Sequence, residues 1–488
     1  MAEYKHGIQI EEKPTSIPRP KEAFSAVQVV VGTAPVNLVS DPSQVVNKPV
    51  LIRTFDEGEK NLGYSDDWEN YTLSEVMDAT FKVFRVGPIV LINVLDPAIH
   101  KKSVTSAKFP ITNKTVKIDK EGVILSSLKV KNADGTTPYE KDKDFLAAFD
   151  DKGEIIISIL SSGAIDPTAT ELSVAYDELD PSAVTKADII GGYDAANNKY
   201  KGLELVKTIF PTFGLIPNLL LAPGYSHHAE VGAILVAKST KINGCFNSTN
   251  LIDLVGNKKE EAEEYKKTSS FDDKSSILLW PKAKIGEKIY RYSSIVGAAI
   301  GVRDAANENV PFKSPSNLLL PISAMVNDDG DEVFLDQVEG NVLNGAGIMT
   351  AINMGGWRTW GNNTAAWNPE DPDYNDPKDR FIAVRRMFDW WGNTFIQAYF
   401  DKVDDAANYK LIESVVDSEN IRANGFKAKG QIAGGKIDFI KADNPVTEIL
   451  NGRIKFVQKV AFFTPAEFIT NELEFDPTIL IDSIFGGE

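Results

Sequence analysis

The chain has 488 residues, of which 43% are hydrophobic and 25% charged, a composition typical of a globular protein with a sizeable core. Its formal net charge of -17 argues against a partner bound through nucleic-acid phosphates, because such binding depends on clustered Lys and Arg. The single cysteine, Cys245, excludes an internal disulfide. With no cation or histidine beside it, we expect a buried, unreactive thiol.

Neither a secretion signal nor a membrane span is visible in the sequence. The first residues lack a basic segment followed by an apolar one, and no run approaches the roughly 20 apolar residues that a spanning helix needs. We therefore expect a soluble protein folded in a cytoplasm. The length predicts several domains, at roughly one per 150 residues.

The N-terminal stretch predicts an isolated strand. Residues 7–12 alternate apolar and polar side chains, and Pro14, Pro18 and Pro20 then indicate an extended linker. So short a strand is unstable alone and must join the edge of a sheet. The sequence leaves open whether that sheet belongs to the same chain.

The next segments predict the opening of an α/β layer. Strands are expected at 26–32, 48–54 and 87–94, with an amphipathic helix at 72–84. From 96 to 179 the chain instead shows short alternating segments divided by turns such as 133–135. We interpret this stretch as a small all-β module inserted into the α/β body, because α/β texture resumes at residue 187.

The middle of the chain predicts a layered body with partly parallel strands. The expected elements are helices at 195–210, 228–238 and 290–300, a charged helix or loop at 257–270, and strands at 216–222, 243–253 and 276–280. Residues 328–331 predict a solvated turn, because the ligand spacing of a calcium loop is absent.

Aromatic residues concentrate near the start of the last third of the chain. Five of the seven tryptophans lie between residues 357 and 391, and a helix is expected from Arg380 with Asp379 as its N-cap. Its apolar stripe comprises Phe381, Val384, Phe388, Trp391, Phe395 and Ala398. The predicted core or interface aromatics are Trp357, Trp360, Phe381, Phe388, Trp391 and Phe395.

The C-terminal region predicts an antiparallel α+β portion. A second helix is expected from 404 to 424, ending at Asn424-Gly425, and strands are expected at 434–440, 452–463 and 467–475. After Asp476-Pro477, residues 478–485 predict a final apolar strand. Strand-like segments thus occupy both ends of the chain.

The residues give no sign of catalysis, cofactor binding or metal binding. The patterns of a P-loop, a dinucleotide fold and a nucleophile elbow are all absent. The one histidine pair, His227-His228, suits joint metal ligation poorly because adjacent side chains point apart in a helix or strand. Arg303 beside Asp304 could form an ion pair at an interface or an active site.

A series of segments taken in chain order carries a resemblance to a known family. The segments are 4–12, 26–34, 48–55 with 62–63 and 71–73, 301–317, 343–345, 357–361 and 381–386. Together they resemble the tail sheath proteins of contractile phage tails, R-type bacteriocins and related contractile injection systems. The resemblance covers nearly the whole chain except 96–182. In Trp357-Arg-Thr-Trp-Gly361 the family's usual order, Trp-Gly before Arg-Thr, is rearranged.

The resemblance implies a multi-domain α/β and α+β fold, in which a layered α/β body carries an all-β insertion and a C-terminal α+β domain with strand-exchanging terminal arms. The implied parts are an N-terminal arm and linker (1–22), the first part of the body (23–95), the inserted surface domain (96–182), the second part of the body (183–375), the C-terminal core domain (376–475) and the C-terminal arm (476–488).

The implied function is mechanical. Subunits form a homo-oligomeric sheath around an inner tail tube, contact baseplate and tail terminator proteins, and contract to drive the tube through a cell envelope. No enzyme activity, cofactor, direct nucleic-acid contact or membrane insertion is expected, and the place is a virion or particle tail assembled in a bacterial cytoplasm. The predicted arm anchors are Ile8, Ile10, Ile479, Ile481 and Phe485. A baseplate component and, less well supported, an α/β enzyme with an inserted domain are the alternatives.

Overall fold

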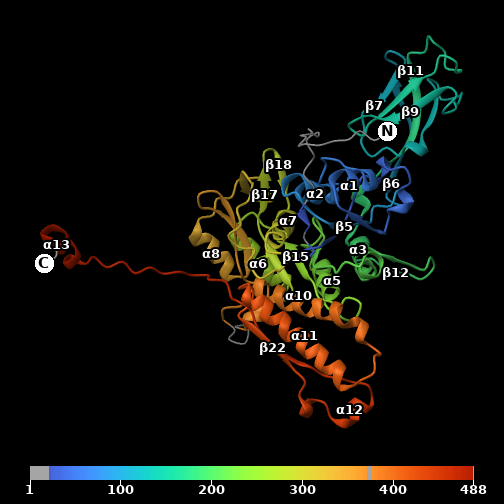
Figure 1. Ribbon diagram of the computed structural model, residues 1–488. Helices are drawn as coiled ribbons and strands as arrows, with labels where there is room; N and C mark the ends of the chain where they lie inside the picture. The colour runs from blue at the N-terminus through green and yellow to red at the C-terminus, as the bar shows by residue number, and fades with distance from the viewer. Residues whose placement is uncertain (1–20, 23, 371–375, 487–488) are drawn as a thin grey trace, which may run out of the picture.

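The computed structural model describes residues 21–22, 24–370 and 376–486 of the chain (Figure 1). It confirms a mixed α/β, multi-domain fold. A central α/β body carries a β module at one end and a helical α+β portion at the other, and the C-terminus extends away from all three (Figure 1).

One eight-stranded sheet forms the centre of the body, in the order β21-β20-β16-β15-β14-β2-β5-β3. The six inner strands run parallel, and the edge strands β3 and β21 are antiparallel to their neighbours. The inner strands are buried and largely apolar, because helices cover both faces of such a sheet. The strands are β2 (Gln28–Gly32), β3 (Pro49–Ile52), β5 (Ile89–Asn93), β14 (Leu219–Leu221), β15 (Thr249–Asp253), β16 (Ser276–Leu279), β20 (Ile348–Asn353) and β21 (Trp357–Trp360).

Short helices and smaller strands surround this sheet. Helix α7 is largely buried, and its apolar side chains join the main core. The helices are α1 (Phe55–Leu62), α2 (Thr72–Met77) with a π-helical turn (Asp78–Val83), α3 (Lys186–Ile190), α4 (Ile209–Phe213), α5 (Ala229–Ser239), α6 (Lys259–Thr268), α7 (Tyr292–Ala305) and α8 (Gln337–Gly345). The small strands are β1 (Lys21–Glu22) paired with β4 (Val86–Gly87), and β17 (Lys282–Ile285) between β18 (Lys288–Tyr290) and β19 (Ala324–Val326).

A separate β module follows β5. Its two three-stranded sheets have the orders β7-β10-β9 and β6-β11-β8, and they enclose their own apolar core around Phe145, Ile157 and Leu172. The strands are β6 (Lys101–Pro110), β7 (Thr115–Ile118), β8 (Lys129–Asn132), β9 (Phe145–Phe149), β10 (Ile155–Ile159) and β11 (Glu171–Leu179). Figure 1 shows this module projecting from the body.

The C-terminal portion places two long helices beside a two-stranded ribbon. Met387, Trp391, Ala423 and Ile432 form its core, joined by Val310 from the body. Its elements are α9 (Pro377–Arg380), α10 (Ile382–Tyr399), α11 (Tyr409–Ala428), β22 (Gly434–Asp438), α12 (Val446–Leu450) and β23 (Val457–Ala461), and the chain ends with α13 (Pro477–Phe485).

Two predicted helices differ from the structure. Residues 195–210 are not one helix: β12 (Gly192–Asp194) and β13 (Lys199–Lys201) form a hairpin, followed by a 3-10 segment (Gly202–Thr208) and α4. The Asp194 carboxylate accepts hydrogen bonds from the backbone amides of Ala196 and Asn197, and this arrangement favours a turn over a helix. Helix α11 continues through Gly425 and stops before Gly430, whose φ of 69° ends it.

Candidate assembly interface

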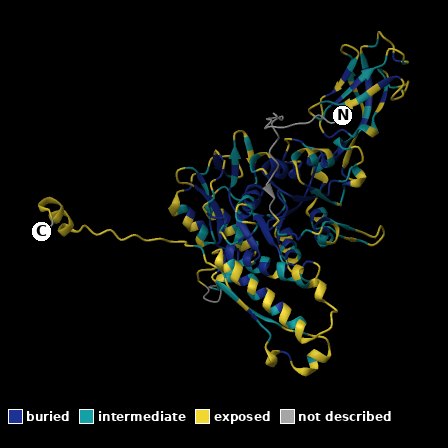
Figure 2. Ribbon diagram, viewed as in Figure 1, coloured by how far each residue is buried: buried dark blue, intermediate teal, exposed yellow. Residues whose placement is uncertain are grey.

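The last part of the chain leaves the body as an extended segment. The extended stretch begins before residue 476, the start implied by the resemblance, so from here on the C-terminal arm means residues 463–485. Residues 463–476 pair with no strand of the described chain, and Figure 2 shows the arm exposed along its length. Phe468 is 86% exposed and Leu473 88% exposed. Contiguous exposed apolar side chains of this size are characteristic of a surface that binds a partner.

The prediction of a final strand at 478–485 is wrong, because these residues form helix α13. Asp476 is the N-cap and its side chain accepts from the Thr478 amide at 2.8 Å, while Pro477 occupies the first helical position. The N-cap and the proline favour a helix here more strongly than the β-branched residues Ile479 and Ile481 favour a strand. The strand predicted over 467–475 is likewise unpaired, and that over 452–463 is limited to β23.

The structure places only part of the predicted arm anchors. Ile479, Ile481 and Phe485 all lie on α13 and are exposed, Phe485 by 79%. Ile8 and Ile10 lie outside the described residues.

The C-terminal arm is tied at its root to helices α9 and α10 of the C-terminal portion. Glu467 forms an ion pair with Arg380 at 2.6 Å, and the Arg380 guanidinium lies 4.0 Å from the centre of the Trp367 ring. Just before the arm, Phe462 packs edge-on against Phe388 with ring centres 4.9 Å apart. These contacts fix where the arm leaves and in which direction.

A buried ion pair anchors the start of the described N-terminal region. The Arg386 guanidinium on α10 donates to Asp304 on α7 at 2.6 and 3.2 Å, and the two side chains are only 4% and 1% exposed. Ser25 donates its hydroxyl to Asp304 at 2.9 Å, and its carbonyl accepts from Arg386 at 3.3 Å. One buried centre therefore joins the N-terminal segment, the body and the C-terminal portion.

Asp304 does not pair with its neighbour Arg303. The ion pair suggested by their adjacency in the sequence is therefore wrong. Successive residues of a helix point about 100° apart, and the two side chains diverge. Arg303 instead donates to the carbonyls of Ser314 and Ser316, each at 3.1 Å. The partner of Asp304 lies 82 residues away along the chain, and no local spacing indicates it.

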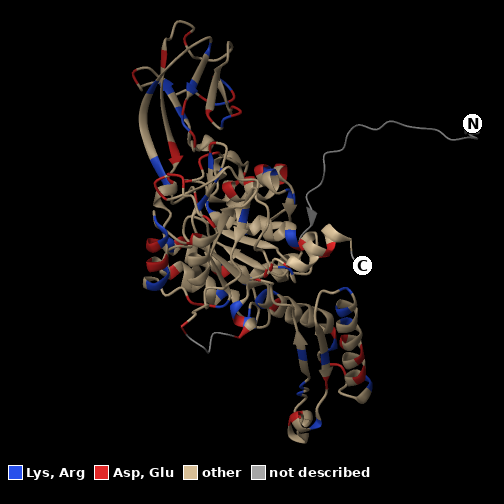
Figure 3. Cartoon of the chain, turned by 90° about the vertical axis from the view of Figure 1, so that its left-hand side faces the viewer, with Lys and Arg blue, Asp and Glu red and all other residues tan. Residues whose placement is uncertain are grey.

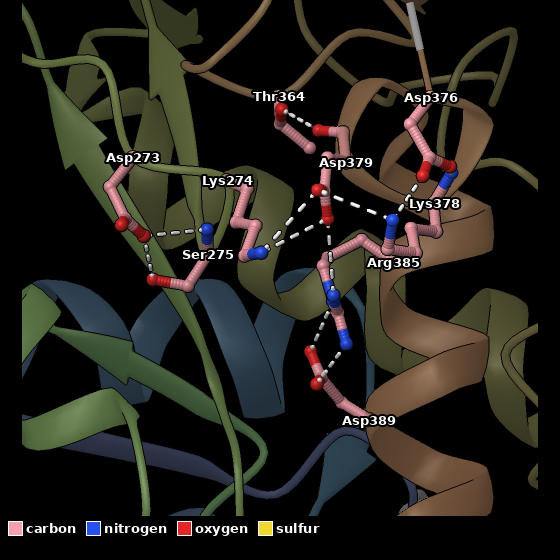
Figure 4. Close-up of polar contacts among 9 residues, drawn as sticks. All are labelled: Asp273, Lys274, Ser275, Thr364, Asp376, Lys378, Asp379, Arg385 and Asp389. Carbon is pink, nitrogen blue, oxygen red and sulfur yellow. Dashed lines mark hydrogen bonds and ion pairs between the residues drawn. The ribbon is translucent and has the colours of Figure 1, made fainter. Parts of the chain in front are cut away.

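A second ionic cluster joins α9 and α10 to the sheet (Figure 4). Asp379 contacts Lys274 at 3.3 Å and Arg385 at 3.4 Å, and Arg385 also contacts Asp389 at 2.7 Å. Burial raises the pKa of the Asp389 carboxyl, an effect that Arg385 opposes. Asp379 was expected to be an N-cap, but the N-cap of α9 is Asp376, which accepts from the Lys378 amide at 3.0 Å.

The predicted aromatic residues fall into two groups rather than one. Trp357 and Trp360 lie on β21, where their indole nitrogens donate to Ser323 and Asn341. The others belong to the C-terminal portion or its entry: Phe381 precedes α10 and is buried, Trp391 lies in the core, Phe388 packs on Phe462, and Phe395 stacks on Tyr399 at 4.8 Å.

The body fills with its own side chains the place where α/β folds often bind anions. The first amides of α7 donate to Glu75 and Asp253, from Arg291 at 2.7 Å and from Ser293 at 2.8 Å. Burial raises the pKa of both carboxyls, although Arg291 lowers them. A helix N-terminus that could hold a phosphate is therefore already capped by carboxylates.

The remaining groups singled out from the sequence are the histidine pair and the single cysteine. His227 and His228 lie between β14 and α5 with ring centres 4.0 Å apart, so the expectation that they point apart is wrong, because the backbone there is neither helix nor strand. Cys245 is half-buried rather than buried. Among the described residues, no group of three or more His, Cys, Asp or Glu could hold a metal ion, and no helix is long and apolar enough to cross a membrane.

Comparison with known sequences gives a match over the full length. No protein-family model matches the chain. The tail sheath protein of Burkholderia phage BcepMu is 27% identical over 509 aligned positions, covering 100% of this chain and 99% of the relative. The tail sheath protein of Escherichia phage P2 is 25% identical over 303 positions, covering 60% of this chain and 72% of that protein.

Solved structures share the fold. A chain of the PVC sheath complex, an extracellular contractile injection system in its contracted state, superposes with a TM-score of 0.56 at 13% identity, covering 98% of this chain and 99% of that one. A chain of the six-fold symmetrised anti-feeding prophage baseplate gives a TM-score of 0.58 at 17% identity, covering 96% and 98%.

The chain therefore shares the fold of chains found in contractile particles. The resemblance predicted from the sequence is confirmed at full length: the chain is related to phage tail sheath proteins, and its role is that of a structural sheath protein.

Proposed function

We propose that copies of this chain polymerise around an inner tube in a metastable extended lattice, and that contraction of the lattice drives the tube through a target cell envelope. The free energy for the stroke is stored during assembly, so that neither catalysis nor a nucleotide is required. The carboxylates at the start of α7 are consistent with this proposal, because they already accept the amides that a bound phosphate would need at that helix.

The observation that carries the proposal is the C-terminal arm. Its extended part exposes apolar side chains such as Phe468 and Leu473, and nothing in the described chain covers them. Strand addition to a neighbour's sheet would satisfy its backbone and bury these side chains. In the proposal the N-terminal arm (residues 1–22), with Ile8 and Ile10, acts in the same way, and α13 anchors the far end through Ile479, Ile481 and Phe485.

The proposed partners are further copies of this chain, the inner tube protein, and baseplate and terminator proteins, in a particle tail assembled in the host cytoplasm. The β module (residues 101–179) lies away from the C-terminal arm and carries its own core, which suits an outward position on the sheath (Figures 1 and 3).

A baseplate component is a second candidate, and the fold match to a chain in the anti-feeding prophage baseplate structure favours it. The two candidates differ in the product of assembly. Electron microscopy of the purified chain mixed with its tube protein distinguishes long regular cylinders from short rings or discs.

Two variants test the role of the arms: deletion of residues 1–20, and replacement of residues 464–475 by a Gly/Ser linker of equal length. The linker keeps α13 and the length of the arm but removes its side chains. We expect both variants to remain folded, because the C-terminal arm contributes little to the core, and to lose cylinders in negative-stain images and fast-sedimenting material. Cylinders of normal length and contraction with both variants would refute the proposal.

A further inference from the structure

The outer face of the sheet β6-β11-β8 in the β module is hollowed into a groove of about 710 Å³. Alternate residues of β11 belong to the core of the module, so the residues between them, Ser173, Ala175 and Asp177, face outward. Ser173 is nonetheless only 5% exposed, because it lies at the bottom of the groove. A hollow of this volume is within the size range of pockets that bind small ligands.

Two irregular features of the backbone shape this face. Strand β6 has a bulge, in which Thr105 and Ser106 together lie opposite Ala175 of β11, and a bulge bends the strand that carries it. On the other side, the turn after β8 folds toward β11: a Cβ added to Gly135 would lie 4.0 Å from the Ser173 hydroxyl. The groove therefore has a wall along each edge of the sheet.

Hydroxyl groups line the groove along its length. They belong to Ser103, Thr105, Ser106, Ser127 and Ser173. The Ser106 and Ser173 hydroxyls lie 3.0 Å apart, and since only one of the two donates to the other, one hydroxyl hydrogen stays available to a ligand. The backbone of β11 is paired with β6 on one side and with β8 on the other, so recognition on this face depends on side chains.

The charge that the groove offers to a ligand is positive. Lys129 and Lys131 on β8 both line it, roughly 6.5 Å apart along the strand. No carboxylate in the described part of the chain lies within ion-pair distance of either lysine. The two carboxylates at the groove are already engaged, Asp177 with Lys101 at 2.7 Å and Asp134 within its own turn at 2.6 and 3.0 Å.

These groups select the chemistry of the ligand. Two ammonium groups require acidic groups on the ligand, and a row of hydroxyls suits a ligand that carries hydroxyls itself. A peptide strand would need a free strand edge, which a sheet face does not offer. A nucleic acid would need exposed rings for stacking, whereas Tyr176, the aromatic residue among those that line the groove, is 5% exposed and belongs to the core of the module. An acidic saccharide meets both requirements.

We propose that the outer face of the sheet β6-β11-β8 binds an anionic saccharide. Lys129 and Lys131 pair with its carboxylate or phosphate groups, and Thr105, Ser106 and Ser173 form hydrogen bonds with its hydroxyls. The inference goes beyond the proposed sheath function and does not depend on it, because the groove is formed within one copy of the chain. In a polymer of copies the repeated grooves would hold a long saccharide by multivalent attachment.

Isothermal titration calorimetry on the full-length chain tests the specificity of the groove. The probes are hexagalacturonate, which carries carboxylates, phosphorylated pentamannose, and maltohexaose, which is uncharged. We expect an anionic saccharide to bind in the micromolar to millimolar range and maltohexaose to give no measurable heat. Binding of either anionic saccharide supports the inference, and the tighter of the two identifies the acidic group.

Variants place the binding in the groove. K129A/K131A should weaken binding by about fivefold to thirtyfold, the loss expected for two solvent-exposed ion pairs. K141A/K143A removes the same charge from the same module at residues that do not line the groove, and it should leave the affinity unchanged. A175W fills the groove and T105V removes one hydroxyl, both without altering the charge, and each should weaken binding.

Several results would overturn the inference. Absence of binding by both anionic saccharides, or equal affinity for maltohexaose, would remove the acidic saccharide as the ligand. Inorganic phosphate or hexaglutamate binding as tightly as the saccharides would show an anion or acidic-peptide site instead. Undiminished binding by both K129A/K131A and A175W would place the ligand elsewhere. None of these results bears on the arms, and loss of cylinders after the arm alterations should leave saccharide binding unchanged.

Discussion

The buried centre around Asp304 gives the sharpest test of how the chain ends are held. In Arg386→Leu the Asp304 carboxylate keeps only the Ser25 hydroxyl as a side-chain partner, and it loses two charge-assisted bonds of 2.6 and 3.2 Å. Removing one partner of a buried pair costs about 3–5 kcal/mol, because the remaining charge is left uncompensated.

The expected result is local, so hydrogen exchange is the appropriate assay. A loss of that size should speed exchange of protected amides in residues 24–30 and 382–392 by about 100- to 5,000-fold where exchange follows opening. The double variant Arg386→Leu/Asp304→Leu should regain most of the protection, since no unpaired charge remains.

A matched control lies close by. Lys429 and Glu308 also form an ion pair of 2.6 Å between the C-terminal portion and the loop after α7, but their side chains are 56% and 65% exposed. Lys429→Met should therefore lower the free energy of local opening by at most about 1 kcal/mol and change the exchange rates little. Equal effects of Arg386→Leu and Lys429→Met would refute the argument that burial, rather than the ion pair itself, gives the centre its importance.

Three further predictions follow from burial and charge. Burial, with His228 and Arg291 nearby, lowers the pKa of His227 from 6.5 to about 4. As the pH falls, the histidine is therefore protonated in the unfolded chain before it is protonated in the folded one, and about 1–2 kcal/mol of stability should be lost between pH 7 and 5. His227→Gln should flatten this pH dependence of stability in thermal unfolding. An unchanged pH profile in the variant would contradict the prediction. Trp391→Ala empties the C-terminal core and should cost about 3–5 kcal/mol, seen as early loss of protection in α10 and α11. Leu473→Asp, at an exposed site, should shift the unfolding of the single chain by less than about 0.5 kcal/mol yet reduce assembly; a marked fall in the stability of the unassembled chain would show that the arm packs on its own body.

Short runs of apolar residues predicted most of the sheet. Buried strands such as β2, β5 and β16 are continuous apolar runs, and helices such as α5 and α7 begin within two residues of their expected starts. These elements depend on local periodicity and on burial that follows from residue type, which a sequence displays directly. The order of segments also sufficed to indicate the sheath resemblance.

Helix and strand boundaries were less well determined where two local signals compete. The run Ile479-Leu-Ile481 suits a strand, yet Asp476 and Pro477 start a helix there, and without a neighbouring strand nothing offsets the cap. Gly425 suggested a helix end, but packing of α11 against β22 carries the helix past it.

The sequence by itself determined the composition of the core, the apolar character of the chain end and the absence of recognisable catalytic patterns. Only the tertiary structure decided which charges meet. Arg386 pairs with Asp304 across 82 residues, and Asn420 on α11 donates to the Ile437 carbonyl on β22. Such contacts depend on how separate elements pack in space, and the energy of a buried charge pair or of a free strand edge is set by that packing rather than by the spacing of residues along the chain.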